Sequence, residues 1–185
     1  MRPARRVEGP ALSGSAPGPV RRLGPGDGEL LRDVRLAALL EAPHAFASTH
    51  ERERDDTAEQ WEARVGRFAW FAVDRHGLVA GATSFDGLPD RRDLISMWVH
   101  PSLRGRGAAG ELIGAVREWA VADGAREITL WVVDGNDPAA RAYTRAGFAP
   151  TGRRQRLPSN PAVEEELWLL RLGERDREWA GPVQA

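Results

Sequence analysis

The stretch LISMWVHPSLRGRGAAGELIGAVREWAVA, residues 94–122, decides the fold of this chain. The first residues of this stretch are mostly apolar and bulky or β-branched, which predicts a buried strand over residues 94–99. Pro101 ends that strand because proline lacks a backbone N–H. After the glycines, Leu112 and Val116 recur at helical spacing and predict one apolar helix face. The stretch therefore predicts a strand, a turn and a helix in succession.

The turn between this strand and helix is basic and rich in glycine, with the sequence RGRGAA over residues 104–109. Glycine lets the backbone approach a ligand closely, and the free amides at a helix start attract anions. Arg104 and Arg106 add cations that suit phosphate oxygens. The turn is therefore predicted to hold phosphate.

Composition narrows the possible functions. The formal net charge of -1 gives no global footprint for nucleic acid. The absence of Cys excludes a disulfide framework, thiolate catalysis and Cys-based zinc sites, and no metal is expected. The absence of Lys excludes a Schiff-base or P-loop lysine. No run of apolar residues approaches the length of a membrane span, and the N-terminus lacks the apolar core of a signal peptide. A cytoplasmic protein is therefore expected.

The chain is predicted to form one domain with two tails. Residues 1–18 are expected to be disordered, residues 19–172 to form the domain, and residues 173–185 to form a charged tail. Helices are predicted over residues 27–40, 57–65, 108–122 and 138–147, the first two with Asp27 and Thr57 as N-caps. Strands are predicted over residues 20–23, 68–73, 78–85, 94–99, 127–133, 148–152 and 164–172, with a polar loop over residues 153–160. This order predicts an α/β (α+β) mixed sheet with helices on both faces.

One interpretation of the glycine turn is a dinucleotide site. Residues 105–110 match G-x-G-x-x-G, and Asp134 ends the next strand, where such a fold places its ribose-binding acid. Residues 100–104 separate the strand from the first glycine, however, and too few residues follow Asp134 for a second nucleotide-binding half. A nucleotide-binding oxidoreductase is therefore the weaker alternative.

Two motifs around the turn favour another interpretation. Residues 94–152 contain Met97-Trp98-Val99, then Arg104-x-x-Gly107-x-Ala109, then Asn136-x-x-Ala139-x-x-x-Tyr143-x-x-x-Gly147-Phe148. In order and separation these motifs resemble the GCN5-related N-acetyltransferase (GNAT) family. The resemblance implies a central mixed, mostly antiparallel sheet, in which strands 94–99 and 127–133 splay apart at the acetyl-CoA cleft. It also implies direct transfer of an acetyl group from acetyl-CoA, the co-substrate, to a primary amine of a small molecule or peptide in a ternary complex.

The resemblance assigns roles to individual residues. The Val99 amide would polarise the thioester carbonyl, and Tyr143 would protonate the leaving thiolate. Without the family pattern, Asn136 would be a helix cap and Tyr143 a packing residue. The cofactor-binding residues that the resemblance implies are Met97, Trp98, Val99, Arg104, Gly105, Arg106, Gly107, Ala108, Ala109, Asn136 and Tyr143.

The base that would deprotonate the acceptor amine is not evident, because the strand over residues 94–99 carries no carboxylate. Ser96 is its only polar side chain and would at most relay a proton through water. Asp86, His50 and Glu166 are further candidates, and direct transfer to an already neutral amine is equally consistent. The missing acid also leaves open a non-catalytic acyl-CoA-binding sensor.

The acceptor site in this family would be built from residues 42–65 and 153–160. Phe46, His50 and Trp61 are candidate substrate contacts, although the two aromatic residues equally suit a core position. No nucleic-acid or membrane partner is expected. Members of the family are often homodimers, but no feature of the sequence marks an interface.

Overall fold

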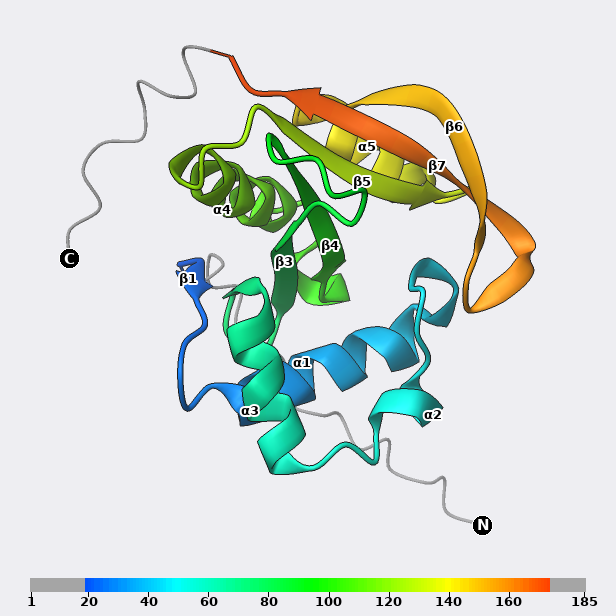
Figure 1. Cartoon of the computed structure of the whole chain (residues 1–185). Helices are drawn as coiled ribbons and strands as arrows, with labels where there is room; N and C mark the ends of the chain where they lie inside the picture. Colours follow the sequence, from blue (N-terminus) through cyan, green and yellow to red (C-terminus); the bar gives the residue numbers. More distant parts are fainter. Residues whose placement is uncertain (1–18, 174–185) are drawn as a thin grey trace, which may run out of the picture.

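Seven strands form one sheet in the order β1-β2-β3-β4-β5-β7-β6, and only the central pair β4–β5 is parallel. The computed structural model describes residues 19–173, so the expected tails lie outside the described residues, apart from residue 173. The strands are β1 (Arg21–Arg22), β2 (Ala69–Ala72), β3 (Gly77–Thr83), β4 (Arg91–Val99), β5 (Glu127–Val133), β6 (Ala149–Leu157) and β7 (Asn160–Arg171). The helices are α1 (Gly28–Glu41), α2 (His50–Glu53), α3 (Ala58–Arg67), α4 (Ala108–Ala122) and α5 (Asp137–Arg145), with 3-10 turns η1 (Pro43–Ala45) and η2 (Pro101–Leu103) (Figure 1). This order matches the prediction apart from α2 and the two 3-10 turns.

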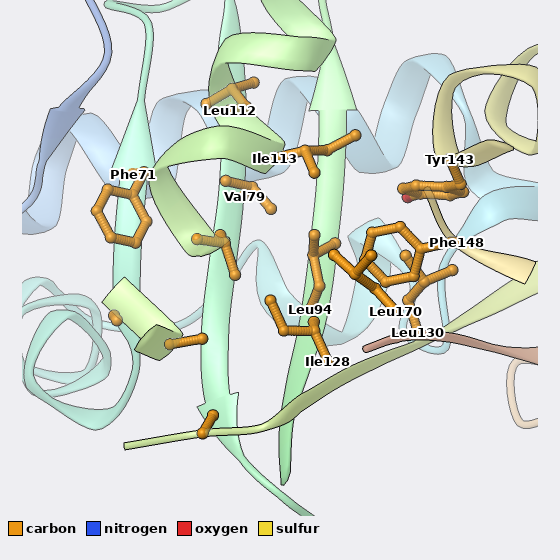
Figure 2. Close-up of a cluster of buried hydrophobic side chains, with 14 of the residues drawn as sticks. Phe71, Val79, Leu94, Leu112, Ile113, Ile128, Leu130, Tyr143, Phe148 and Leu170 are labelled. Atoms are coloured by element: carbon orange, nitrogen blue, oxygen red, sulfur yellow. The ribbon is translucent and has the colours of Figure 1, made fainter. Parts of the chain in front are cut away.

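The helices divide between the two faces of the sheet. On one face, α1 and α3 contribute Leu31 and Trp61 to a buried cluster that includes Leu78 of β3. On the other face, α4 and α5 contribute Leu112 and Tyr143 to a second cluster (Figure 2). The fold is therefore α+β, with a mixed, mostly antiparallel sheet covered on both faces, as predicted.

The start of α1 depends on a side chain from α3. The carboxylate of Asp27 binds Arg21 at 2.7 and 2.8 Å and the Gly24 N–H at 2.9 Å, and it does not cap the helix as predicted. Instead, Glu62 of α3 accepts a hydrogen bond from the Gly28 N–H at 3.0 Å. A Cβ at Gly28 would lie 2.9 Å from the Glu62 nitrogen, so the two helices approach this closely only because residue 28 is glycine.

The β6–β7 hairpin is longer than predicted. The expected loop over residues 153–160 is wrong, because the two strands occupy all of it except a turn at residues 158–159. Opposite charges face each other across the strands, as where Arg154 Nε donates to Glu164 at 3.0 Å. Such cross-strand pairs stabilise an exposed polar ribbon in which no apolar alternation marks the strands.

Candidate active site

The parallel strands β4 and β5 are paired at one end only. Three register pairs join them, the last between Asp93 and Thr129, and beyond it the two strands continue without pairing with each other. Figure 1 shows them pointing in different directions past this position. The closed end comprises residues 91–93 and 127–129, and the open end comprises residues 94–99 and 130–133.

A β-bulge lies at the start of the open end. Opposite residues 78–80 of β3, the stretch of β4 over residues 95–98 carries one residue more than its partner. Ser96 lies in this bulge with a left-handed φ of 58°. Arg35 of α1 holds it, because Nη1 of the guanidinium donates to the Ser96 hydroxyl at 3.3 Å. A bulge bends a strand and increases its twist, which accounts for the separation of β4 from β5.

The backbone of β4 presents hydrogen-bonding groups to the open end. The His100 N–H donates to the His76 carbonyl at 2.7 Å and therefore points toward the β3 side of β4. Successive peptide groups of a strand point to opposite sides, so the N–H and C=O of Val99 point toward β5, and those of Met97 do the same. Arg104 Nε donates to the Val99 carbonyl at 3.0 Å, which leaves the Val99 N–H directed into the open end.

The turn before α4 has a backbone that glycine adopts readily. Gly105 and Gly107 have φ values of 76° and 93°. The first hydrogen bond of α4 runs from the Glu111 N–H to the Gly107 carbonyl at 3.2 Å, so the amides of residues 108–110 have no acceptor inside the helix. Free amides at the positive end of a helix dipole bind anions.

The two arginines of this turn differ in their surroundings. Arg104 Nη2 donates to Glu41 at the end of α1 at 2.6 Å, and the same carboxylate accepts from Trp98 Nε1 at 3.0 Å. The Arg104 hydrogen bond is the main reason why the pKa of Glu41 is lowered. The guanidinium of Arg106 forms no hydrogen bond or ion pair with any residue that the structure describes, and only its backbone N–H is bonded, to the Leu103 carbonyl at 3.2 Å. Arg106 is therefore available to an anion, whereas Arg104 already links α1 to β4.

Asn136 caps the N-terminus of α5, the role that its residue type alone suggests. Its Oδ1 accepts a hydrogen bond from the Ala139 N–H at 3.3 Å, so the side chain caps α5. Capping uses the oxygen of the side-chain amide and leaves the Nδ2 donor for another partner.

Tyr143 of α5 is buried between its helix and the sheet. Its side chain is 7% exposed, and its ring meets Phe148 edge to face at a centroid distance of 5.8 Å (Figure 2). No other described residue hydrogen-bonds its hydroxyl group. Burial raises the pKa of this phenol, so it keeps its proton at neutral pH. Tyr143 thus combines a packing role with a free proton donor.

The two segments expected to form the acceptor site lie together. Ser159, in the β6–β7 turn, donates from Oγ to the Phe46 carbonyl at 2.5 Å. Phe46 follows η1 and lies under the Arg35 guanidinium, 4.9 Å from the ring centroid. His50 begins α2 and is half-buried, whereas Trp61 is 1% exposed in the α1–α3 core. Trp61 therefore has the core position that the sequence left open.

A buried ion-pair network supports the bulge from the α1 side. Arg35 binds Glu53 of α2 through two hydrogen bonds of 2.8 and 3.0 Å, and Arg64 of α3 donates to the same carboxylate at 2.7 Å. Burial alone would raise the pKa of Glu53, but hydrogen bonds and charges from Arg35 and Arg64 outweigh it and hold this pKa at about 2. The sequence shows Glu53 only as one of several charges on a polar segment, which reads as a solvated helix face. Its pairing with a residue eighteen positions earlier has no local signal.

The candidate bases from the sequence are mostly engaged by other groups. Asp86 is bound by Arg153 at 2.9 Å. Glu166 accepts from a backbone N–H at 2.9 Å, and its register partner on β5, Val132, belongs to the cluster under α4 and α5. Glu166 therefore lies on the face opposite the acceptor segments. Asp93, at the closed end, accepts hydrogen bonds from the Thr129 hydroxyl and a backbone N–H.

None of the helices within residues 19–173 is long and apolar enough to cross a membrane. No group of three or more His, Asp or Glu side chains in that part of the chain has the arrangement of a metal site.

Known proteins resemble this chain in sequence. A model of the acetyltransferase (GNAT) family matches residues 35–148. Streptothricin acetyltransferase of Streptomyces lavendulae is 32% identical over 143 residues, which cover 76% of this chain and 74% of that protein. Mycothiol acetyltransferase of Paenarthrobacter aurescens (strain TC1) is 26% identical over 155 residues, which cover 79% of this chain but 43% of that protein.

Solved structures share the fold. A GNAT-family acetyltransferase from Streptococcus pneumoniae superposes with a TM-score of 0.65 at 19% identity, covering 83% of this chain and 98% of that one. The protein yncA of Salmonella typhimurium, solved with its cofactor acetyl-CoA, gives a TM-score of 0.65 at 19% identity, with 84% and 94% covered. This mixed sheet is not the doubly wound parallel sheet that a dinucleotide site requires, so the oxidoreductase alternative is wrong.

Proposed function

This chain belongs to the acetyltransferase (GNAT) family and is an acetyl-CoA-dependent acetyltransferase; on that premise we propose that it acetylates a primary amine of a small molecule or peptide. The transfer is direct, with acetyl-CoA and the amine bound together. The observation that carries this proposal is the open end of β4–β5, which leaves strand backbone without a partner beside the N-terminus of α4.

Acetyl-CoA binds along this open end in the proposed complex. Its pyrophosphate meets the amides of residues 105–109 and the cation of Arg106, since phosphate oxygens suit both groups. Its pantetheine arm adds to β4 like a strand, pairing with the backbone of Met97 and Val99. The Nδ2 donor of Asn136 binds the same arm. Arg104 acts in this arrangement by fixing the Val99 carbonyl rather than by binding phosphate.

The proposed chemistry uses two groups, the Val99 N–H at the open end and the Tyr143 hydroxyl of α5. The Val99 N–H polarises the thioester carbonyl and stabilises the oxyanion that forms when the amine attacks. The Tyr143 hydroxyl, which is protonated at neutral pH, then gives its proton to the departing CoA thiolate. Ser96 has a hydroxyl group near this site, but its hydrogen bond with Arg35 makes it a support for the bulge first.

Streptothricin is the first acceptor to test, because the relative that carries its name is 32% identical across three quarters of both chains. Acceptors would enter from the face of α1 and α2, where the β6–β7 turn meets Phe46. Other amines, including a peptide N-terminus, are the comparison set.

Two measurements test the proposal. Acetyl-CoA at a hundredfold excess over Kd should raise the free energy of unfolding by about 2.7 kcal/mol, and NAD should leave it unchanged. Turnover is then measured as thiol released from acetyl-CoA in the presence of streptothricin; the chain itself contains no Cys and gives no background signal. Stabilisation by acetyl-CoA without thiol release for any amine would contradict the proposal and favour an acyl-CoA sensor.

A further inference from the structure

Three glutamates in a row on β7, residues 164–166, have different surroundings. Glu164 binds Arg154 at 3.0 Å and its side chain is 54% exposed, and Glu166 accepts from a backbone N–H. Glu165 is 5% exposed, and no cation binds it among the described residues. Its only hydrogen bond to a described residue comes from Gln155 of β6, whose Nε2 donates to Oε1 at 2.7 Å. A buried carboxylate without a cation is unfavourable for stability and is often retained for a functional reason.

The register of β5 and β7 shows which face Glu165 occupies. Ile128, Leu130 and Val132 of β5 point into the cluster under α4 and α5, so the alternate residues point to the opposite face. Glu165 pairs with Val133, one of these alternate residues. It therefore lies on the sheet face that α1 and α3 cover farther along, the face from which an acceptor would enter.

The position along the sheet also places Glu165 beside the open end. Val133 is the last residue of β5, well past the last β4–β5 pair at Thr129. Beyond it the hairpin continues to Ser159, which contacts Phe46. Glu165 thus lies between the open end, where acetyl-CoA is proposed to bind, and the contact that brings the two acceptor segments together.

The other charged side chains around this face are engaged by partners of their own. Arg153 of β6 binds Asp86 at 2.9 Å and lies over Trp131, 5.7 Å from its ring centroid. Asp93 of β4 is held by a hydroxyl and a backbone N–H, and Arg35 and Glu53 bind each other. Burial therefore dominates the environment of the Glu165 carboxyl and raises its pKa, in spite of the opposing Gln155 hydrogen bond. A raised pKa makes a carboxylate a better proton acceptor.

We propose that Glu165 is the catalytic base that receives the acceptor ammonium and takes its proton, an inference that rests on the proposed amine acetylation. The carboxylate removes one proton from R–NH3⁺, and the nitrogen lone pair of R–NH2 forms the N–C bond to the acetyl carbon. The C–S bond breaks and the sulfur leaves as thiolate. Tyr143 protonates the thiolate and regains a proton from the acetylated nitrogen. Glu165 releases its proton to water, which leaves an amide, CoA thiol and one proton.

Two acceptors of nearly equal size separate a base from a structural residue. Ethylamine is an ammonium ion at neutral pH, whereas methoxyamine is uncharged and needs no deprotonation before attack. With saturating acetyl-CoA, Glu165→Gln should lower kcat/KM for ethylamine by about a hundredfold or more and that for methoxyamine by less than about threefold. Glu164→Gln, on the same strand but exposed, should leave both rates near wild type. Glu165→Asp should retain part of the ethylamine activity, because it keeps a carboxylate.

Stability gives a second readout. The folded-state pKa of Glu165 is raised, so its effect on stability favours the folded state at low pH and is lost as pH rises through that pKa. Glu165→Gln should therefore raise Tm at neutral pH while it lowers ethylamine turnover. A residue needed only for packing would lower Tm when replaced.

Each other outcome identifies what is wrong. The base assignment would be overturned if Glu165→Gln acetylated ethylamine as fast as wild type does. It would also be overturned by an equal loss of kcat/KM with both acceptors, or by a fall in Tm. A Glu165→Gln protein that does not fold would also overturn it, since the neutral amide should stabilise the chain. If wild type acetylates none of the amines, neither these probes nor streptothricin nor a peptide N-terminus, the proposed amine acetylation itself fails, and the base role with it.

Discussion

The closed and open ends of β4–β5 are built from the same two strands, but the strands pair with each other only at the closed end. At the closed end the backbones pair, and side chains reinforce them, with Arg91 bound to Glu127 at 2.8 Å and the Thr129 hydroxyl bound to Asp93. At the open end the strands do not pair, and Ser96 bends β4 away with a left-handed backbone.

The difference lies in whether the polar groups of the two strands are bonded within the chain. The closed end bonds its backbone and side-chain polar groups to each other, and it thereby joins the two halves of the sheet. At the open end a strand amide has no strand partner, the α4 N-terminus has free amides and the Tyr143 phenol has no hydrogen-bond partner among the described residues, and Arg35 and Glu53 support the bulge from the α1 side. A functional site of this kind is expected to lose activity and stability through different residues.

The largest effect should come from removing the support of the open end. Glu53→Ala leaves Arg35 without its carboxylate and removes one of the two carboxylates that Arg64 binds, so it should lower the free energy of unfolding by about 3–5 kcal/mol. The control is Asp55→Ala, whose side chain is 83% exposed and which should change stability by no more than about 0.5 kcal/mol. Urea denaturation measures both, and equal effects would show that the network does not support this region.

The Glu53 carboxylate also predicts how the free energy of unfolding changes at acidic pH. Glu53 has a pKa of about 2 in the folded state, and a glutamate in the unfolded chain titrates near about 4.3, so the unfolded state binds protons first. Its contribution is present above about pH 4.3 and is lost as pH falls toward 2, on the order of 3 kcal/mol in total. The slope of unfolding free energy over this window should be smaller in Glu53→Ala, and identical slopes would contradict the assignment.

Activity at the open end should depend on Tyr143 more than stability does. Tyr143→Phe keeps the ring against Phe148 but removes the proton donor, so kcat should fall about a hundredfold, or roughly 2.7 kcal/mol in barrier. The acetyl-CoA Kd should stay within about twofold. Steady-state kinetics and calorimetric titration provide these values, and unchanged kcat would leave Tyr143 as a packing residue only.

The closed end should respond in the opposite way. Thr129→Val keeps the shape of a side chain that is 2% exposed but removes the hydroxyl that Asp93 accepts from, which should lower the free energy of unfolding by about 1–2 kcal/mol. The kcat should change by less than about twofold, because no reacting group is proposed there. A large loss of kcat without a loss of stability would contradict the claim that the closed end contributes to stability and not to catalysis.

The sequence predicts the fold where local signals agree. The order of elements, the Thr57 cap of α3 and the glycine turn before α4 follow from short patterns that neighbouring residues complete. The Asp27 cap failed because Arg21 and the Gly24 N–H bind the Asp27 carboxylate, while Glu62 of α3 accepts from the Gly28 N–H. The β6–β7 ribbon was missed because its stability comes from charges across the strands, and these leave no apolar period to detect.

The site is less accessible from the sequence for a similar reason. The resemblance to the family points to candidate residues along β4 and α5, but the support of Ser96 by Arg35 and Glu53 joins residues distant in the chain. Glu166 is among the candidate bases named from the sequence, and Glu165, its neighbour on β7, is not. A shift of one position along a strand reverses the face, and only the register of β7 with β5 resolves it.

Amide hydrogen exchange, with and without acetyl-CoA, tests the central claim most directly. If the cofactor adds to β4 at the open end, the Met97 and Val99 amides should gain protection, together with the amides of residues 105–109. Amides of the closed end should change little, because they are already paired. Protection at the closed end alone, or none on β4 at saturating acetyl-CoA, would contradict the account.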